Sequence, residues 1–256
     1  MLIIAYVVIF LLVFMIGICI GSFLNVVIYR VPRGLNIAKG RSFCPKCNNI
    51  IKARDLVPLA SFCLLRGHCR FCGDSISSRY PLVEFMGGLM AILSVWVFWF
   101  TPSALLVFGV TCILILITFI DIDTQEIPYT LNIILMVFGV LAIFVFPQLG
   151  WLSHVVGIFC IAVPMIIINL IVADSFGGGD IFLCVACGLF LGWQNMLVAT
   201  FIGIVLGGIY GVYLLAKKKK EKKEHFAFGP FLAFGITIAM FWGRSIIEAY
   251  LGIFSF

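Results

Sequence analysis

Residues 1–29 read MLIIAYVVIFLLVFMIGICIGSFLNVVIY and contain no Lys, Arg, Asp or Glu. The stretches 85–120, 127–173, 181–216 and 226–243 are equally free of these residues. A helix needs about 20 apolar residues to cross a bilayer, so the longer stretches each have room for two. With 63% hydrophobic and only 11% charged residues, the chain is not an ordinary soluble enzyme, a disordered protein or a coiled coil.

Turn-forming residues divide the long apolar stretches into segments of spanning length. The turns are Thr101-Pro102-Ser103, Pro147-Gln148-Leu149-Gly150 and Gly192-Trp193-Gln194-Asn195. The fold class predicted from this pattern is an all-α polytopic membrane protein with about eight transmembrane helices. We expect these helices at 2–28, 82–100, 104–121, 128–146, 151–173, 180–193, 196–216 and 229–248.

The distribution of charge predicts how the chain is oriented in the membrane. Residues 30–80 carry ten Lys or Arg against Asp55 and Asp74, and residues 217–223 carry six Lys and one Glu. An excess of Lys and Arg marks cytoplasmic loops, so both segments are predicted to be cytoplasmic. The segment at 180–193 is short enough to be re-entrant. The lysine run at 217–223 would then lie on the extracytoplasmic side, so we count the segment as a span. The N-terminus is then expected to be extracytoplasmic, with the first segment as an uncleaved anchor.

The loop at 30–80 contains two C-x-x-C pairs. Two such pairs at this separation are typical of a structural zinc site in which four thiolates bind one ion, and redox chemistry is the alternative. The loop has little apolar core of its own, so a metal would supply much of its folding energy. Cys63 lies outside both pairs and is expected to be a free thiol. The predicted zinc ligands are Cys44, Cys47, Cys69 and Cys72.

Two carboxylates lie at the predicted cytoplasmic ends of membrane segments. Asp121 directly follows an apolar run, and an ionisable group in that position indicates a function. Asp123 would point about 200° away from it on a helix, so the two cannot face one site. Asp180 follows three glycines that would break the helix, and Gly177 and Gly179 would let an extended substrate backbone approach. A flexible turn with an N-terminal capping aspartate is the alternative for this segment.

Asp121 and Asp180 together suggest an aspartyl protease pair. Two carboxyl groups held close together cannot both ionise, so they share one proton. One of them would act as general base on a water molecule, while its protonated partner would polarise the carbonyl group that is attacked.

In this combination the sequence resembles the type IV prepilin peptidases, which are bacterial integral-membrane aspartyl proteases of the G-x-G-D class. The resemblance spans nearly the whole chain, and its five motifs occur in the family's order. They are GSFLNVVIYRVP at 21–32, the two C-x-x-C pairs, SRYPLVE at 78–84, D-I-D-x-x-x-I-P at 121–128 and G-x-G-D at 177–180.

The resemblance implies a fold, an activity and a location. The family's catalytic aspartates fall on Asp121 and Asp180, and its members cut the basic leader from prepilins and pseudopilins at the cytoplasmic face of the bacterial inner membrane. Residues 1–100 would form an N-terminal region with two spans and the zinc loop. Residues 104–216 would form the peptidase core, and 217–256 a basic loop and a last span. Where many members have a lysine two residues after the G-x-G-D aspartate, this chain has Phe182.

The resemblance also implies a second activity. Many members methylate the new N-terminal amine with S-adenosylmethionine, and the long first loop is similar to that of the bifunctional members. Glu84 could hold a developing ammonium or a ribose hydroxyl, and Gly88 could allow a ligand to approach closely. The alternative is that Gly88 packs helices and Glu84 is an interfacial charge.

Two other classes of protein remain as alternatives. Intramembrane carboxylates also mark ion pathways in transporters, although those would be expected near the bilayer midplane. A zinc-ribbon membrane scaffold without chemistry would make both aspartates dispensable. The basic charge balance is explained by topology and an anionic lipid bilayer, so no nucleic-acid partner is expected.

Overall fold

The computed structural model describes residues 1–172, 175–217 and 227–254. Asp174 and most of the predicted lysine-rich loop, from residue 218 onward, lie outside the described residues. The chain divides into two compact units, Met1–Ala104 and Leu105–Phe256, and each is considered by itself.

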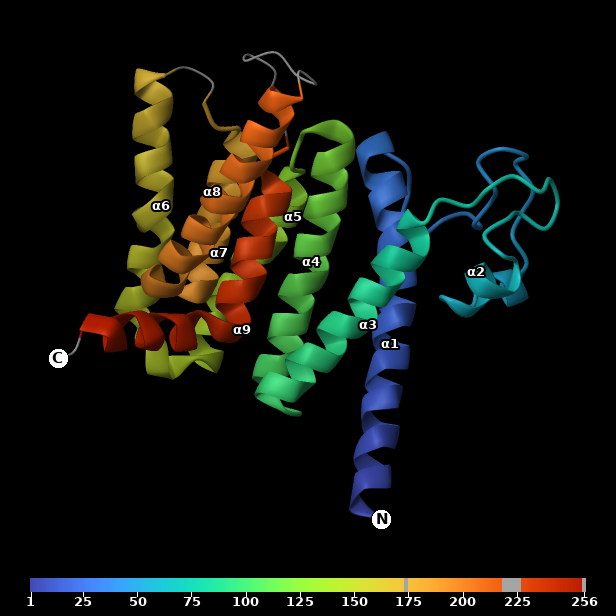
Figure 1. Ribbon diagram of the computed structural model, residues 1–256, viewed down its shortest axis with the longest axis horizontal. Helices are drawn as coiled ribbons and strands as arrows, with labels where there is room; N and C mark the ends of the chain where they lie inside the picture. Colours follow the sequence, from blue (N-terminus) through green and yellow to red (C-terminus); the bar gives the residue numbers. More distant parts are fainter. Residues whose placement is uncertain (173–174, 218–226, 255–256) are drawn as a thin grey trace. The chain divides into compact units, whose positions relative to one another are not determined.

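Long apolar helices account for most of both units (Figure 1). The first unit contains α1 (Leu2–Arg30), η1 (Val31–Arg33), η2 (Ala53–Asp55), α2 (Ala60–Leu64) and α3 (Arg79–Phe98). The second unit contains nearly all of α4 (Pro102–Thr124), followed by α5 (Tyr129–Val145), η3 (Pro147–Leu149), α6 (Trp151–Ile171), α7 (Gly178–Leu191), α8 (Trp193–Ala216) and α9 (Gly229–Phe254).

The all-helical membrane fold predicted from the sequence is confirmed, but eight full-length spans are not. Six helices of the described chain are long and apolar enough to cross a bilayer: α1, α3, α4, α6, α8 and α9. The other two predicted spans correspond to α5, with 17 residues, and α7, with 14. At 1.5 Å per residue α7 is about 21 Å long, which is shorter than the roughly 30 Å hydrocarbon core.

In the first unit, α1 and α3 cross at glycines. A Cβ added to Gly17 would lie 2.6 Å from the carbonyl oxygen of Gly87, and a Cβ added to Gly21 would lie 2.8 Å from the Cα of Glu84. Small residues let two membrane helices approach until their backbones touch. Within a membrane, van der Waals packing and not the hydrophobic effect holds helices together. The glycines of these two helices therefore set how closely α1 and α3 pack.

In the second unit, α7 is enclosed by other helices. Eight of its residues are buried, and it packs against α5, α6 and α8. At the closest crossing, a Cβ on Gly188 of α7 would overlap the carbonyl oxygen of Gly157 in α6, and the reverse also holds. Because α7 is surrounded by protein, the irregular backbone that precedes it need not face lipid, where unpaired backbone groups are very costly.

The predicted turns occur where the helices end. Gly150 precedes α6 with φ of 71°, and Gly192 lies between α7 and α8 with φ of 73°, a conformation that favours glycine. Pro128 forms the N-cap of α5. The end of α4, the start of α5 and the starts of α7 and α9 meet at one end of the unit, joined by two hydrogen bonds and by packing on Ile127.

The crossing of α6 and α7 gives a first test. Gly188→Ala should lower the free energy of unfolding by about 1–3 kcal/mol, because the added methyl group forces the two helices apart. Gly208→Ala in α8 is the matched control, since a Cβ there meets nothing within 4 Å. Thermal unfolding in detergent micelles measures both, and equal melting temperatures for the two variants would contradict this account of the packing.

Candidate active site and metal centre

Asp121 lies in the last turn of α4 and is only 4% exposed. Its carboxylate oxygen Oδ2 accepts a hydrogen bond of 3.0 Å from the backbone N–H of Gly229. Gly229 is the first residue of α9, and the first N–H groups of a helix have no partner within it. A Cβ at position 229 would lie 2.6 Å from the same oxygen, so this contact requires glycine.

Asp180 is the third residue of α7. Its backbone N–H donates a hydrogen bond of 3.1 Å to the carbonyl oxygen of Gly177. Its side-chain oxygen Oδ1 is buried and has no hydrogen-bond partner among the described residues. Buried carboxylate oxygens are rarely left unpaired, so this atom is available to a water molecule or a substrate.

Ile127 joins the two aspartate sites. This buried side chain lies 2.9 Å from where a Cβ on Gly179 would be, and 3.3 Å from where one on Gly229 would be. Ile127 therefore packs against the neighbour of Asp180 and the hydrogen-bond donor to Asp121. The carboxyl groups of Asp121 and Asp180 are close enough to interact electrostatically. Asp123 is exposed, as the 200° rotation predicts.

Two buried or half-buried asparagines fix the glycine turn, and sequence reasoning missed both of them. Asn132 of α5 donates from Nδ2 to the carbonyl oxygen of Gly179 at 3.2 Å. Asn169 of α6 exchanges two hydrogen bonds of 2.8 Å with the backbone of Phe176. An isolated Asn in an otherwise apolar segment was the available signal. Gly229 was missed because nothing in Phe228-Gly229-Pro230 indicates a partner 108 residues earlier.

The turn glycines are needed for space and not for an unusual backbone conformation. None of Gly177, Gly178 and Gly179 has a positive φ, so their dihedral angles do not require glycine. Gly179 is required because of Ile127. A Cβ on Gly177 would lie 3.3 Å from Oδ2 of Asp180, at an exposed position next to the carboxylate.

Phe182 lies in α7, two residues after Asp180. Its ring packs edge-on against Tyr129 of α5, with centroids 5.6 Å apart. The hydroxyl of Tyr129 lies 3.7 Å from where a Cβ on Gly178 would be. An aromatic pair therefore lies beside the glycine turn.

The four predicted metal ligands in the first unit converge. The sulfur atoms of Cys44, Cys47, Cys69 and Cys72 all lie within 4.8 Å of one another, and those of Cys44 and Cys72 are 4.0 Å apart. Tetrahedral zinc with Zn–S bonds of 2.3 Å places its sulfurs about 3.8 Å apart. The cluster therefore has the composition and nearly the spacing of a closed four-thiolate site, while Cys63 is exposed and outside it.

The two C-x-x-C turns are built alike. In each, the N–H of the first cysteine bonds the carbonyl of the fifth residue after it, namely Asn49 or Asp74. The residue after the second cysteine has a positive φ in each turn, 56° at Asn48 and 71° at Gly73. Backbone N–H groups of Cys72 and Phe71 lower the pKa of Cys69 to about 7, which favours the thiolate that binds metal.

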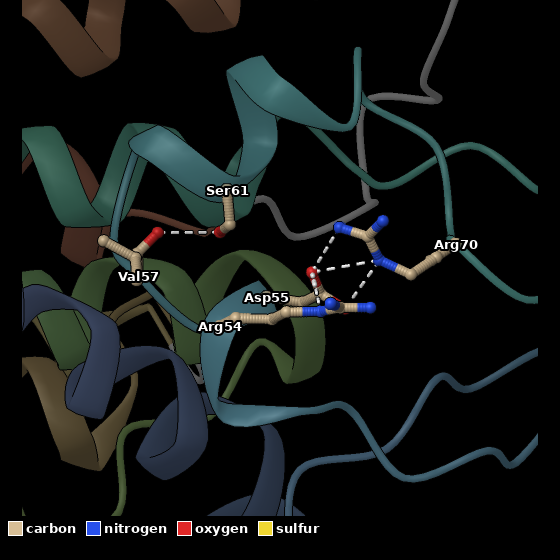
Figure 2. A network of polar contacts seen from close by, with 5 residues as sticks. All are labelled: Arg54, Asp55, Val57, Ser61 and Arg70. Atoms are coloured by element: carbon tan, nitrogen blue, oxygen red, sulfur yellow. Dashed lines mark hydrogen bonds and ion pairs between the residues drawn. The ribbon is translucent and has the colours of Figure 1, made fainter.

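An ion pair supports the second turn (Figure 2). Arg70 donates to both carboxylate oxygens of Asp55 at 2.7–3.1 Å, which ties η2 to the second cysteine pair. The Arg70 guanidinium lowers the pKa of the Asp55 carboxyl by these hydrogen bonds. A bidentate pair of this kind fixes orientation as well as distance.

Glu84 and Gly88 both have structural partners in α1 or the loop. Oε2 of Glu84 accepts a hydrogen bond of 2.8 Å from the backbone N–H of Leu59. Gly88 is buried, and a Cβ there would overlap the ring of Phe14 and lie 2.7 Å from Ile18. These contacts are those of a loop anchor and a helix-packing position, and a role in methyl transfer stays a prediction.

The fold and the two aspartates together define a multi-pass membrane protein with the features of an intramembrane aspartyl peptidase. Residues 15–98 match the bacterial peptidase A24 N-terminal domain, and residues 108–212 match the type IV leader peptidase family. The chain belongs to the type IV leader peptidase family. This assignment favours neither a transporter nor a scaffold without chemistry.

Similar proteins cover nearly the whole chain. The prepilin leader peptidase/N-methyltransferase of Aeromonas salmonicida (strain A449) is 33% identical, with 94% of each chain covered. The protein of the same name in Legionella pneumophila is 33% identical over 95% of this chain and 94% of its own. That of Neisseria gonorrhoeae is 34% identical over 84% of each. No solved structure matches the chain.

The hydrogen bond between Gly229 and Asp121 gives a test of the site. Gly229→Ala should lower the rate of prepilin cleavage by roughly tenfold or more, because the new methyl group displaces the Asp121 carboxylate. Gly208→Ala serves again as control and should cleave at the wild-type rate. Cleavage is followed by mass spectrometry, with the melting temperature measured alongside. Wild-type cleavage by Gly229→Ala would show that this contact does not position the carboxylate.

Proposed function

We propose that this protein cuts the basic leader from type IV prepilins or pseudopilins, with Asp121 and Asp180 as the catalytic pair. The observation that carries the proposal is the placement of these two carboxyl groups at one end of the second unit. One is held by the N–H of Gly229, and the other keeps a buried oxygen without a partner among the described residues.

The arrangement fits peptide hydrolysis by a pair that shares one proton. The ionised carboxylate takes a proton from water as the water oxygen attacks the scissile carbonyl carbon. The protonated carboxyl donates to the carbonyl oxygen, giving a tetrahedral intermediate. The carbon–nitrogen bond then breaks, and the leaving amine receives a proton from the pair. Gly229 would hold the Asp121 carboxyl in position throughout the reaction. Oδ1 of Asp180, which has no partner among the described residues, would face the reacting groups.

The access of substrate is supported by the glycine turn. Gly177 and Gly178 are exposed and lack side chains, so an extended peptide can approach Asp180 from that side. Asn132 and Asn169 hold the backbone of the turn in place, as a rigid approach surface requires. A transporter would need its carboxylates near the middle of the spans, whereas Asp121 and Asp180 lie at the ends of their helices.

The chain is a multi-pass protein of the bacterial inner membrane, and its orientation is part of the proposal. The cysteine loop and both aspartates would lie on the cytoplasmic side, with the N-terminus outside, because basic loops stay in the cytoplasm. This orientation puts the catalytic pair on the side where a basic leader peptide would remain.

We also propose a second activity, methylation of the new N-terminus with S-adenosylmethionine, because the similar proteins of Aeromonas salmonicida and Legionella pneumophila are prepilin leader peptidase/N-methyltransferases. Glu84 stays the proposed contact to the methyl donor or the amine, although it already accepts the N–H of Leu59. Gly88 is the weaker candidate because a larger side chain there would separate α1 from α3.

Zinc is the proposed ion of the four-cysteine cluster, in a structural role. Four thiolates fill a tetrahedral coordination shell, so no position is left for a substrate or a water molecule. The loop between α1 and α3 contains only the short elements η1, η2 and α2, so a metal would contribute much of its stability.

Substitution of the aspartates tests the proposed catalytic pair. Asp121→Asn and Asp180→Asn should each lower cleavage roughly a thousandfold or more, and the double variant should lose little beyond that, because the pair acts as one unit. The exposed Asp123→Asn is the control and should stay within a few-fold of wild type. The measurement is mass spectrometry of a prepilin incubated with purified protein and S-adenosylmethionine. A fully active Asp180→Asn would contradict the pair.

The same assay separates the two activities. The aspartate variants should still methylate a pilin that has already been trimmed, whereas Glu84→Gln should cleave and lose methylation. Joint loss of both activities in Glu84→Gln would show that Glu84 acts only as a loop anchor.

Replacement of the cysteines tests the metal. Ser in place of any of Cys44, Cys47, Cys69 or Cys72 should lower the zinc content of the purified protein and its melting temperature, because three thiolates hold the ion less tightly. Cys63→Ser should change neither quantity, since that thiol lies outside the cluster. Zinc per chain is measured by inductively coupled plasma mass spectrometry. If the intact protein contained no zinc, the proposed metal site would be contradicted.

A further inference from the structure

The loop of the first unit exposes a set of apolar side chains that its fold does not cover. They belong to residues 53–66, which contain η2 and α2 and which we call the α2 hairpin. Leu64 is 81% exposed, Val57 45% and Leu56 41%. Three large apolar side chains at this exposure, within one short segment of the chain, indicate a surface that contacts an apolar partner.

Two polar side chains of the hairpin, those of Asp55 and Ser61, have hydrogen-bond partners within the loop. Asp55 has a side chain only 5% exposed and is bound by Arg70, and the hydroxyl of Ser61 donates to the carbonyl oxygen of Val57 at 2.7 Å. Figure 2 shows the two sets of contacts, Ser61 with Val57, and Asp55 with Arg70 and Arg54. The internal hydrogen bonds fix the backbone on which Leu56, Val57 and Leu64 stay outside. The exposed apolar surface is therefore a defined feature of the hairpin.

The hairpin folds back along the membrane helices. Leu59, just before α2, donates its N–H to Glu84 in the second turn of α3. Glu84 in turn contacts Gly21 of α1, which lies nine residues before the end of that helix at Arg30. Nine residues of α-helix span about 13 Å. The hairpin is thus anchored at the level of the apolar part of α1, below the basic residues that end the helix.

The first cysteine turn is anchored elsewhere. The ring of Phe43 packs against that of Tyr29, at the very end of α1, with centroids 6.2 Å apart. Phe43 pairs with Ile50, which is 53% exposed. The two ends of the loop therefore differ in depth along α1, and Ile50 provides a comparison for Leu64.

The charge of the hairpin identifies its partner. Both acidic residues of the loop form ion pairs within it, Asp55 with Arg70 and Asp74 with Lys46. Arg54 and Arg66 flank the apolar residues and both are exposed; Arg54 also pairs with Asp55 at 4.0 Å while 65% of its side chain stays exposed. Apolar side chains between cations are suited to an anionic lipid surface, where the apolar groups enter the acyl boundary and the cations meet phosphates.

We propose that the α2 hairpin lies in the headgroup region of the leaflet at which α1 ends, with Leu56, Val57 and Leu64 in contact with acyl chains. Arg54 and Arg66 bind the phosphates of anionic phospholipids. The hairpin thereby holds the cysteine loop against the membrane surface. A basic peptide would be repelled by the same cations, and the proposal does not depend on the catalytic pair.

The test uses the full-length protein in lipid nanodiscs that contain a phospholipid with a diazirine in its acyl chain. After illumination, labelled peptides are mapped by mass spectrometry. Peptides covering 56–64 should be labelled, and those covering 45–51 should not. Leu56→Ser combined with Leu64→Ser should lower labelling of the hairpin roughly tenfold, because two of three apolar contacts are lost. Ile50→Ser is the matched control and should leave the labelling unchanged.

A second arm tests the charges. Labelling of 56–64 should be stronger in nanodiscs with phosphatidylglycerol than in phosphatidylcholine alone, and Arg54→Gln combined with Arg66→Gln should abolish this difference. Zinc content and melting temperature are measured for each variant, so that loss of labelling through unfolding is recognised. Equal labelling of 45–51 and 56–64, or cross-links from the hairpin to a second copy of the chain instead of lipid, would overturn the proposal.

Discussion

A carboxylate buried among apolar helices must be hydrogen-bonded, and this requirement organises the second unit. Asp121 lies in the last turn of α4 and is only 4% exposed. The backbone N–H of Gly229 donates a hydrogen bond to its carboxylate. The contact brings the start of α9 to the end of α4 and excludes any side chain at 229. Ile127 then packs against both Gly229 and Gly179, which brings the start of α7, with Asp180, close to the start of α9. The geometry of the proposed active site therefore follows from how one buried charge is accommodated.

The short helix α7 is compatible with this arrangement because it does not face lipid by itself. Its 14 residues are enclosed by α5, α6 and α8, and close contact at Gly157 and Gly188 draws α6 against it. Enclosure by protein allows the backbone before Asp180 to be irregular, since Asn132 and Asn169 supply the hydrogen bonds that a longer helix would have made internally. A turn held in this way can combine exposed glycines with a fixed carboxylate.

The loop of the first unit is stabilised in a different way, because it has too few buried apolar side chains to fold by the hydrophobic effect. Specific contacts hold the loop together in place of a core. They are the two equivalent cysteine turns, the bidentate ion pair of Arg70 and Asp55, and the hydrogen bond from Leu59 to Glu84. Each of these connects segments distant in sequence at a defined geometry. The loop can consequently be ordered while Leu56, Val57 and Leu64 remain outside, available to the membrane surface.

The sequence by itself determined the helical membrane fold, the positions of the turns, the four cysteines and the two aspartates, because apolar runs, glycines and paired thiols act locally or at fixed spacing. It marked the segment of α7 as short, but it could not show that α5 is also shorter than a full span, since apolar residues beyond a helix end look the same as those within it. Only the tertiary structure decided the parts played by Gly229, Asn132, Ile127 and Glu84. Their roles arise from contacts between helices far apart in the chain, and no local pattern records which backbone group a buried side chain will meet.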